Sequence, residues 1–383
     1  MRSIDRIAYL DNKTKQLVYD ELGYALGRQG GSAIQYWVYH GKSPSRLEDV
    51  ENLARIITQR GGWENELELR AYLEAAGHHA PEQFSRQLMR NSIEYEANPM
   101  DGDLVPRPAF VVGPPILHPH LFFGRDRELK RIFTLINGQA MQNIIITGLE
   151  RSGKTSLLHY LRKITRTPSS ALRPDQFREW LPKPERFNWS YIDFQDPRVY
   201  MPEGLMTYIL RSLNFPVPKP CSLNQFVDVI SSYLTKPTIL LMDEFQVALA
   251  NPEFTPRVWQ SLRSLISNLT EGRLAIVATT SGSLTKLAKD HERAVLLLNI
   301  FGYTLDLGPL TEDEALQLIR SSPTPFATED TDWIMVNSGH WPALVQLLCS
   351  TRLENIMDGD RSDGWKVQGL SRIQPYQHLL NQV

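Results

Sequence analysis

The sequence predicts an α/β fold in which helices flank a parallel sheet, preceded by an all-helical unit at residues 1–96. Three observations support this. Short apolar runs of strand length alternate with helical patterns from residue 143 onward. One of these runs leads directly into a glycine-rich loop, and another ends in two adjacent carboxylates. Residues 1–96 instead repeat their apolar side chains every three or four positions, as amphipathic helices do.

The composition narrows the class of protein. A chain of 383 residues is too long for one compact core, so we expect two or three domains. Its 41 basic and 43 acidic side chains argue against a surface coated for nucleic acid or anionic lipid. Cys221 and Cys349 lie far apart without metal-ligand spacing, which predicts ordinary thiols in a reducing compartment. Without a signal peptide or a membrane-length apolar run, we expect a cytoplasmic protein with no membrane partner.

The glycine-rich loop matches the phosphate-binding pattern G-x-x-x-x-G-K-[ST], known as a P-loop, and follows the apolar run 144–146. Its glycines let backbone N–H groups turn toward phosphate oxygens, and the following helix adds its positive end. Lys154 would reach the β- and γ-phosphates, and the Thr155 hydroxyl would coordinate Mg²⁺. The residues predicted to hold the phosphates are Gly148, Leu149, Glu150, Arg151, Ser152, Gly153, Lys154, Thr155 and Ser156.

A second apolar run, 238–242, ends in Asp243 and Glu244. A strand next to a nucleotide-bound magnesium must deliver such carboxylates. Asp243 would hold the Mg²⁺ through its water shell, and Glu244 would polarise the attacking water. The simpler alternative is that both acids only cap the following helix. The guanine-reading motif N-K-x-D is absent, which favours ATP and ADP as the nucleotides.

The segment just before the first strand carries a family resemblance. Phe123-Gly124-Arg125, followed by Glu128-Leu129, resembles the "F-x-GR-x-x-E-L" opening of P-loop ATPases of the AAA+ and STAND (signal-transduction) types. The resemblance implies that Phe123, Gly124 and Arg125 fold over the adenine and ribose.

The further predicted strands lie at 188–195, 273–281 and 304–310, with a helix at 222–234. The family resemblance implies a five-stranded sheet of order 5-1-4-3-2. The strand at 273–281 would then lie between the P-loop strand and the Asp243 strand. Either Thr280 or Ser281, at its end, would sense the γ-phosphate.

Two later segments of the sequence resemble the small helical lid of the same ATPases. Residues 310–315 resemble its opening "L-x-x-L-[ST]-x-x-E-A", and 337–349 resemble its "GG-x-P-x-x-L-Q-x-L" helix, with His340 in place of the second glycine. Pro342 would then pack near the base. His340 would either approach the phosphates or merely begin a helix.

Three arginines, at 257, 263 and 273, follow the acidic strand. Arg263 is the best placed of them to act as an arginine finger for a neighbouring subunit. The alternative is that each is a solvated surface charge.

Within residues 1–96, the run from Leu22 to Ile57 resembles phage-repressor-like helix-turn-helix domains, with Ser32–His40 in the recognition position. The predicted outward side chains are Arg28, Ser32, Gln35, Tyr36, His40 and Lys42. Against DNA binding, the unit carries 12 basic and 14 acidic side chains, a net charge of −2. A protein-recruiting adaptor, an oligomerisation module and a structural cap are therefore open alternatives.

These parts predict an ATP-dependent molecular switch: the helical module 1–96, a proline-rich linker 97–120, an ATPase core 121–310, and a lid and tail 311–383. ATP would close the lid on the core and control self-association, or the binding of DNA or a protein by the module. The main alternative is a DNA-binding regulator that senses ATP and ADP with little hydrolysis. A third is a scaffold that binds ADP only for stability.

Overall fold

The computed structural model describes residues 2–10, 14–26, 28, 30–59, 62–63, 66–86, 88, 109–138, 140–282, 287, 295–360 and 362–381. The chain divides into two compact units, Met1–Leu104 and Val105–Val383. The first half of the predicted linker, residues 97–108, lies outside the described residues. No helix within the described ranges combines the length and apolarity needed to cross a bilayer.

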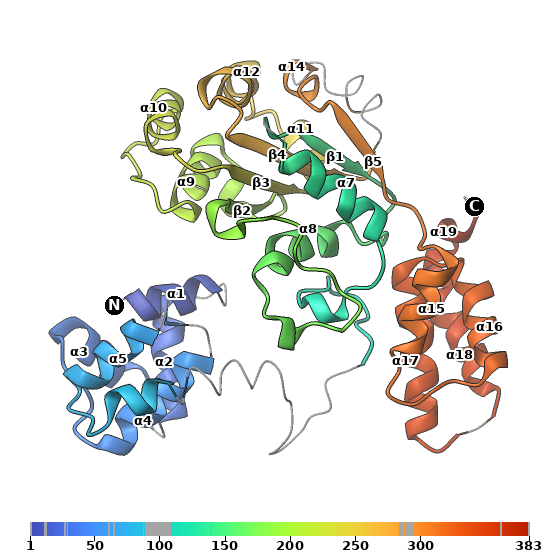
Figure 1. Ribbon diagram of the computed structural model, residues 1–383, viewed down its shortest axis with the longest axis horizontal. Helices are drawn as coiled ribbons and strands as arrows, with labels where there is room; N and C mark the ends of the chain where they lie inside the picture. Colours follow the sequence, from blue (N-terminus) through green and yellow to red (C-terminus); the bar gives the residue numbers. More distant parts are fainter. Residues whose placement is uncertain are drawn as a thin grey trace. The chain divides into compact units, whose positions relative to one another are not determined.

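The described part of the first unit is helical (Figure 1). Its helices are α1 (Arg2–Leu10), α2 (Lys15–Ala25), α3 (Ser32–His40), α4 (Leu47–Gln59) and α5 (Glu66–Ala75). Their apolar faces share one core, in which Leu22, Ile34 and Leu69 are buried. The predicted helical periodicity of this unit is therefore confirmed for these elements.

Glycines shape the turn between α2 and α3. A Cβ on Gly23 would lie 2.0 Å from the carbonyl oxygen of Gly30, and one on Gly31 would lie 2.4 Å from the carbonyl carbon of Tyr19. The Gly31 N–H donates to Asp20 Oδ1 at 2.8 Å. The close approach of the turn to α2 therefore excludes any larger residue at Gly23 and Gly31.

The second unit contains a five-stranded parallel sheet. Its strands are β1 (Ile144–Thr147), β2 (Asn188–Asp193), β3 (Thr238–Asp243), β4 (Leu274–Thr280) and β5 (Tyr303–Asp306). They lie in the order β2-β3-β4-β1-β5, which confirms the predicted order 5-1-4-3-2. Every residue of β1, β3 and β4 is buried, which explains why these strands are continuous apolar runs.

Helices cover both faces of the sheet, as Figure 1 shows. One face packs on α7 (Asp126–Ile136) and α8 (Lys154–Lys163). The opposite face packs on α9 (Pro202–Ser212), α10 (Leu223–Tyr233), α11 (Phe245–Ala250), α12 (Pro256–Ser264) and α14 (Val295–Leu298). In β1, Ile144 and Ile146 enter the first of these cores and Ile145 the second, because alternate side chains of a strand point to opposite faces.

A small helical bundle follows the sheet. It consists of α15 (Glu312–Arg320), α16 (Thr328–Ser338), α17 (Pro342–Met357), α18 (Gly364–Ile373) and α19 (Gln377–Leu380). Thr311 and Glu314 form a capping box that starts α15, within the segment that resembles the opening of the lid. We call this bundle, residues 311–381, the lid.

The second half of the predicted linker is not a free spacer. Phe110 is buried in the apolar core of the lid, where it stacks on Phe326 with ring centroids 6.2 Å apart. The Ile116 N–H donates to Ser156 Oγ at 3.0 Å, so the same segment also touches α8. Prolines suggested a linker, but apolar side chains between them find partners on two different elements. We call residues 109–118 the strap.

Candidate functional site

The P-loop joins β1 to α8, and its two glycines have different structural reasons. Gly153 precedes α8 with φ of 95°, in the left-handed region, and a Cβ there would meet no atom within 4 Å. A Cβ on Gly148 would lie 2.6 Å from the carbonyl oxygen of Leu307, just after β5. Gly148 therefore permits close packing, and Gly153 permits the backbone conformation.

Lys154 places a cation inside the loop. Its side chain is 6% exposed, and its ammonium donates to the carbonyl oxygens of Gly148 at 2.9 Å and Leu149 at 2.8 Å. Burial lowers the pKa of Lys154, although the carboxylates of Glu244 and Asp243 act in the opposite direction. A partly desolvated ammonium gains from an anion placed beside it.

Asp243, at the end of β3, is held by two hydroxyl groups. The Tyr191 hydroxyl donates to Oδ2 at 2.9 Å, and the Thr279 hydroxyl donates to Oδ1. Thr279 Oγ1 also accepts a hydrogen bond from the backbone N–H of Glu244 at 3.1 Å. Asp243 is only 2% exposed, so these donors replace the water that would otherwise solvate the carboxylate.

Glu244 takes a conformation that is uncommon for a residue with a side chain. Its φ is 53°, in the left-handed region, at the junction of β3 and α11. Its carboxylate accepts a hydrogen bond from the Gln246 side-chain amide, and both residues line the same cavity as Gln195, which follows β2. Strained backbone of this kind concentrates at functional sites.

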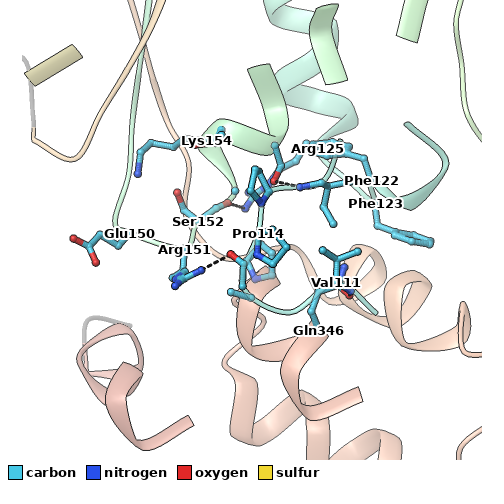
Figure 2. Close-up of a pocket in the computed structure, with 18 of the residues that line it drawn as sticks. Val111, Pro114, Phe122, Phe123, Arg125, Glu150, Arg151, Ser152, Lys154 and Gln346 are labelled. Carbon is cyan, nitrogen blue, oxygen red and sulfur yellow. Dashed lines mark hydrogen bonds between the residues drawn. The ribbon is translucent and has the colours of Figure 1, made fainter. Parts of the chain in front are cut away.

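One cavity of about 480 Å³ connects the P-loop, the acidic strand end, the strap and the lid (Figure 2). The core contributes Lys154, Thr155 and Glu244, and the lid contributes Pro342 and Gln346. Figure 2 shows the Arg151 guanidinium directed at the strap, where it donates to the Gly113 carbonyl oxygen at 2.6 Å. The volume is that of a typical small-molecule site.

Arg125 ties the core to the lid. Its guanidinium, 4% exposed, donates to the carbonyl oxygens of Gly308, Pro309 and Ser152. Its backbone N–H donates to Glu314 in the first turn of the lid. Burial lowers the pKa of Arg125, against the effect of neighbouring acids. Arg125 lines the cavity, but its guanidinium donates to backbone carbonyl oxygens at the junction between core and lid.

Gly124 serves the same junction. Its φ is 69°, and a Cβ there would lie 2.7 Å from the Glu314 carboxyl carbon. Gly124 does not line the cavity, whereas its neighbour Phe123 does.

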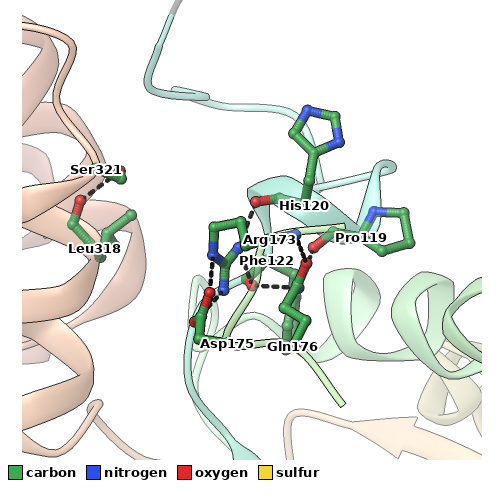
Figure 3. Close-up of polar contacts among 8 residues, drawn as sticks. All are labelled: Pro119, His120, Phe122, Arg173, Asp175, Gln176, Leu318 and Ser321. Carbon is green, nitrogen blue, oxygen red and sulfur yellow. Dashed lines mark hydrogen bonds and ion pairs between the residues drawn. The ribbon is translucent and has the colours of Figure 1, made fainter. Parts of the chain in front are cut away.

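An excursion between α8 and β2, residues 167–187, packs against the part of the cavity wall that Phe122 and Phe123 form. Arg173 donates to the carbonyl oxygens of His120 and Phe122 (Figure 3). Its guanidinium carbon lies 3.8 Å from the centre of the Phe123 ring. Gln176 Nε2 donates to the Pro119 carbonyl oxygen at 2.7 Å. The excursion therefore fixes the position of the residues at 119–123.

The structure brings most of the predicted site residues together. Those that line the cavity are Phe123, Arg125, Glu150, Arg151, Ser152, Gly153, Lys154, Thr155, Ser156, Glu244, Ser281 and Pro342. Gly148 and Leu149 contribute the carbonyl oxygens that receive Lys154. Thr280 is fully buried opposite Thr147 in β1, so Ser281 is the one of the two sensor candidates that reaches the cavity.

His340, Arg263 and Asp243 do not line the cavity, although Glu244, next to Asp243, does. His340 has φ of 61°, its N–H donates to Ser338 Oγ at 3.2 Å, and its carbonyl oxygen accepts from the Leu310 N–H at 2.9 Å. It therefore turns the chain from α16 into α17. Arg263 lies in the last turn of α12.

Sequence reasoning missed several residues of the site. Thr279 precedes the two hydroxyl residues that were considered, and only the pairing of β4 with β3 shows that it reaches Asp243. The strap was assigned to a linker from its prolines. Gln346 occupies the Q of the lid motif and is a polar residue in an otherwise apolar stretch, and these are the signals that could have identified it.

The residues present fit a phosphate-bearing ligand. The Lys154 ammonium is buried, with loop carbonyl oxygens as its hydrogen-bond partners, and the space beside Gly153 is open. Ser152 Oγ and Gln246 Oε1 are buried atoms of the cavity wall that have no hydrogen-bond partner among the described residues. Such unsatisfied groups are stabilised by a ligand or its water. The Thr155 hydroxyl and the Asp243 carboxylate are oxygen donors of the kind that Mg²⁺ prefers.

No protein-family model matches the sequence, and no curated protein matches it either. Solved structures do resemble it. A Walker-type ATPase of Pyrococcus abyssi is 14% identical, with 70% of this chain and 78% of that chain covered and a TM-score of 0.50. The ORC2 protein of Aeropyrum pernix, in ADPNP and ADP complexes, is 15% identical, with 70% of this chain and 72% of that chain covered and a TM-score of 0.51.

At such low sequence identity, the similarity to these structures shows the fold alone. The chain has a P-loop NTPase fold: a five-stranded parallel sheet flanked by helices, with a phosphate loop after β1 and two carboxylates at the end of β3.

Proposed function

We propose that the protein is an ATPase of the AAA+/STAND-like kind, in which bound nucleotide controls closure of the lid and thereby self-association or partner binding by residues 1–96. One observation carries the proposal. A single cavity is lined by the phosphate loop, by Glu244 at the end of the acidic strand and by α17 of the lid. A ligand filling it would contact core and lid at once, so its binding would favour one arrangement of the two.

Each polar residue at the loop end has a role in this proposal. Lys154 would neutralise phosphate charge, and Ser152 Oγ would donate to a phosphate oxygen. Thr155 and Asp243 would hold Mg²⁺, which supplies charge stabilisation to the phosphates when it is bound. Glu244 would orient the attacking water and accept its proton. Gln246, which now donates to Glu244, has an unpartnered Oε1 that can orient the same water.

The γ-phosphate sensor would act through β4. Ser281 lines the cavity, and Thr279 links Asp243 to the backbone of Glu244. We assign contact with the phosphate to Ser281 and the positioning of the carboxylates to Thr279. Thr280 is fully buried and its Oγ1 accepts a hydrogen bond from the Gly282 N–H at 3.2 Å, so it would hold the end of β4 without contacting the phosphate.

Self-association in the ATP state is the form of control that we favour. Arg263 lies away from the cavity of its own chain, and an arginine finger acts on the site of a neighbour. Light scattering of the Glu244→Gln variant should show a larger assembly with ATP than with ADP. Equal mass in both nucleotides would rule out the assembly switch.

A DNA-binding regulator is the second candidate, and the surface of α3 favours it. Tyr36, His40 and Lys42 are exposed on or just after this helix, and no acidic residue occurs between Glu21 and Glu48. Salt-dependent binding of duplex DNA by the full chain would support this function. Binding that does not change on substitution of Lys42 and His40 would exclude α3 as the contact.

The central test compares two site variants with matched controls. Lys154→Ala should abolish ATP binding measured by calorimetry, because phosphate charge would lose its buried counter-charge. Glu244→Gln should retain binding but stop phosphate release, because an amide cannot accept the proton. Lys130→Ala and Glu253→Gln make the same chemical changes at exposed positions and should leave both properties unchanged. ATP binding by Lys154→Ala at the wild-type affinity would refute the assignment of the site.

A further inference from the structure

The lid presents one amide to the cavity. Gln346, on α17, is 8% exposed and lines the cavity. Its Oε1 accepts a hydrogen bond from the backbone N–H of Val111 in the strap at 3.0 Å, and Figure 2 shows the two residues facing each other. A backbone N–H can only donate, so this contact fixes which end of the amide is oxygen.

The other end of the amide is therefore a donor. Nε2 carries two N–H groups, and no residue in the described part of the chain accepts a hydrogen bond from them. The amide is thus anchored by its oxygen and free at its nitrogen, beside a cavity large enough for a nucleotide.

Gln346 lines the cavity from the lid, and Figure 2 shows it on the other side of the drawn residues from Lys154. Lys154 and Glu244 define the phosphate end. The strap and the lid also line the cavity, next to Phe122 and Phe123, and their side chains there are mainly apolar: Val111, Ile116, Leu318, Pro342 and Ala343. A nucleotide anchored by its phosphates at the P-loop would place its base between these apolar surfaces.

We infer that Gln346 reads the base of the nucleotide, with Nε2 donating to a ring-nitrogen acceptor of adenine. The inference rests on the proposed function, and it adds the basis of selectivity. Adenine offers ring-nitrogen acceptors and a single amino group. Guanine would bring N1–H and N2–H donors, while Gln346 Oε1, the side-chain acceptor among the lid residues that line the cavity, already accepts the Val111 N–H. Burial of unpaired donors costs affinity.

The same amide couples recognition to closure. Gln346 belongs to the lid, and its oxygen accepts from the strap, so a base bound to Nε2 would be linked to both segments through one side chain. A nucleotide without a purine base would lack this link to the lid and the strap.

Glu is the informative replacement for Gln346. Its carboxylate still accepts the Val111 N–H, so the strap contact is kept, while the donor to the base is lost. We expect Gln346→Glu to weaken ATP binding roughly tenfold, the effect of one lost buried hydrogen bond. GTP binding should be unchanged or tighter, because a carboxylate can accept from guanine N–H groups. The ATP-to-GTP affinity ratio should therefore fall by at least tenfold.

Calorimetry with ATP, GTP and magnesium tripolyphosphate, on the full chain, tests this. Tripolyphosphate has no base, so wild type and Gln346→Glu should bind it equally. Gln317→Glu, the same change at an exposed position of α15, should leave all three affinities at their wild-type values.

The outcomes separate the inference from the proposed function. An unchanged ATP-to-GTP ratio in Gln346→Glu, with ATP bound by both proteins, overturns the reading of the base and leaves the ATPase proposal intact. Loss of tripolyphosphate binding in Gln346→Glu also overturns it, because the effect would then be on the fold of the site. Wild type that binds neither ATP nor tripolyphosphate refutes the proposed function, and the inference falls with it.

Discussion

Removal of the Tyr191 hydroxyl is the sharpest test of how the acidic strand is organised. Tyr191 lies on β2, and its hydroxyl donates to Asp243 Oδ2 at 2.9 Å. Tyr191→Phe keeps the ring, which packs against the His159 ring with centroids 4.6 Å apart. The substitution therefore removes one hydrogen bond from a buried carboxylate and little else.

The magnitude follows from the surroundings of Asp243. Because the residue is 2% exposed, bulk water cannot replace the lost donor. A hydrogen bond to a charged group contributes about 1.5–3 kcal/mol, and Thr279 still donates to the other oxygen, so we expect a loss of about 2 kcal/mol. If the lost hydrogen bond instead destabilises the Mg²⁺-bound protein, about 2 kcal/mol corresponds to a roughly thirtyfold higher Mg²⁺ requirement.

Two measurements on the same protein check this prediction. Urea denaturation of the nucleotide-free chain gives the free energy of unfolding, and Mg²⁺ titration of ATP turnover gives the metal requirement. Tyr233→Phe, which removes a hydroxyl from a half-exposed side chain, is the control. A Tyr191→Phe variant with the wild-type unfolding midpoint and the wild-type Mg²⁺ dependence would show that the hydroxyl does not position Asp243.

Three further predictions concern the P-loop, the junction with the lid and pH. Gly148→Ala should abolish ATP binding measured by calorimetry, because the new Cβ would lie 2.6 Å from the carbonyl oxygen of Leu307. The control is Gly302→Ala, whose Cβ would meet no atom within 4 Å and which should bind ATP normally. Arg125→Ala should lower the free energy of unfolding, measured in urea, by about 3–5 kcal/mol, because it leaves buried carbonyl groups unpaired. Arg125→Lys should not restore this stability, because one ammonium cannot reproduce the forked donors of a guanidinium. Burial, and then Lys163, lower the pKa of His159 from 6.5 to about 4. Between these pH values the unfolded chain binds more protons than the folded one, so the free energy of unfolding should fall by up to about 3 kcal/mol as pH drops through this window. His159→Gln should lack that slope in urea titrations at several pH values; an identical slope would refute the assignment.

The contacts of the strap and of Thr279 could not be predicted from the sequence. Six prolines within 97–120 predicted a spacer, because proline restricts the backbone wherever it stands. Whether such a segment is free depends on partners elsewhere in the chain. Here Gln346, 235 positions away, receives the Val111 N–H, and no local pattern records a contact of that range. The role of Thr279 could not be predicted for a similar reason. Several hydroxyl residues stand at the end of this strand, and only the pairing with β3 determines which of them reaches Asp243.

What the sequence determined by itself was the chemistry that depends on local spacing. The loop from Gly148 to Thr155, the carboxylates after β3 and the alternation of strands with helices are consequences of neighbouring residues, and the structure has the elements that they predicted. Only the tertiary structure decided which distant residues complete the cavity. It placed Ser281 in the wall, kept His340 out of it, and added the strap and Gln346. The physical reason is that backbone conformation is governed by local sequence, whereas the position of a side chain relative to a ligand depends on how whole elements pack.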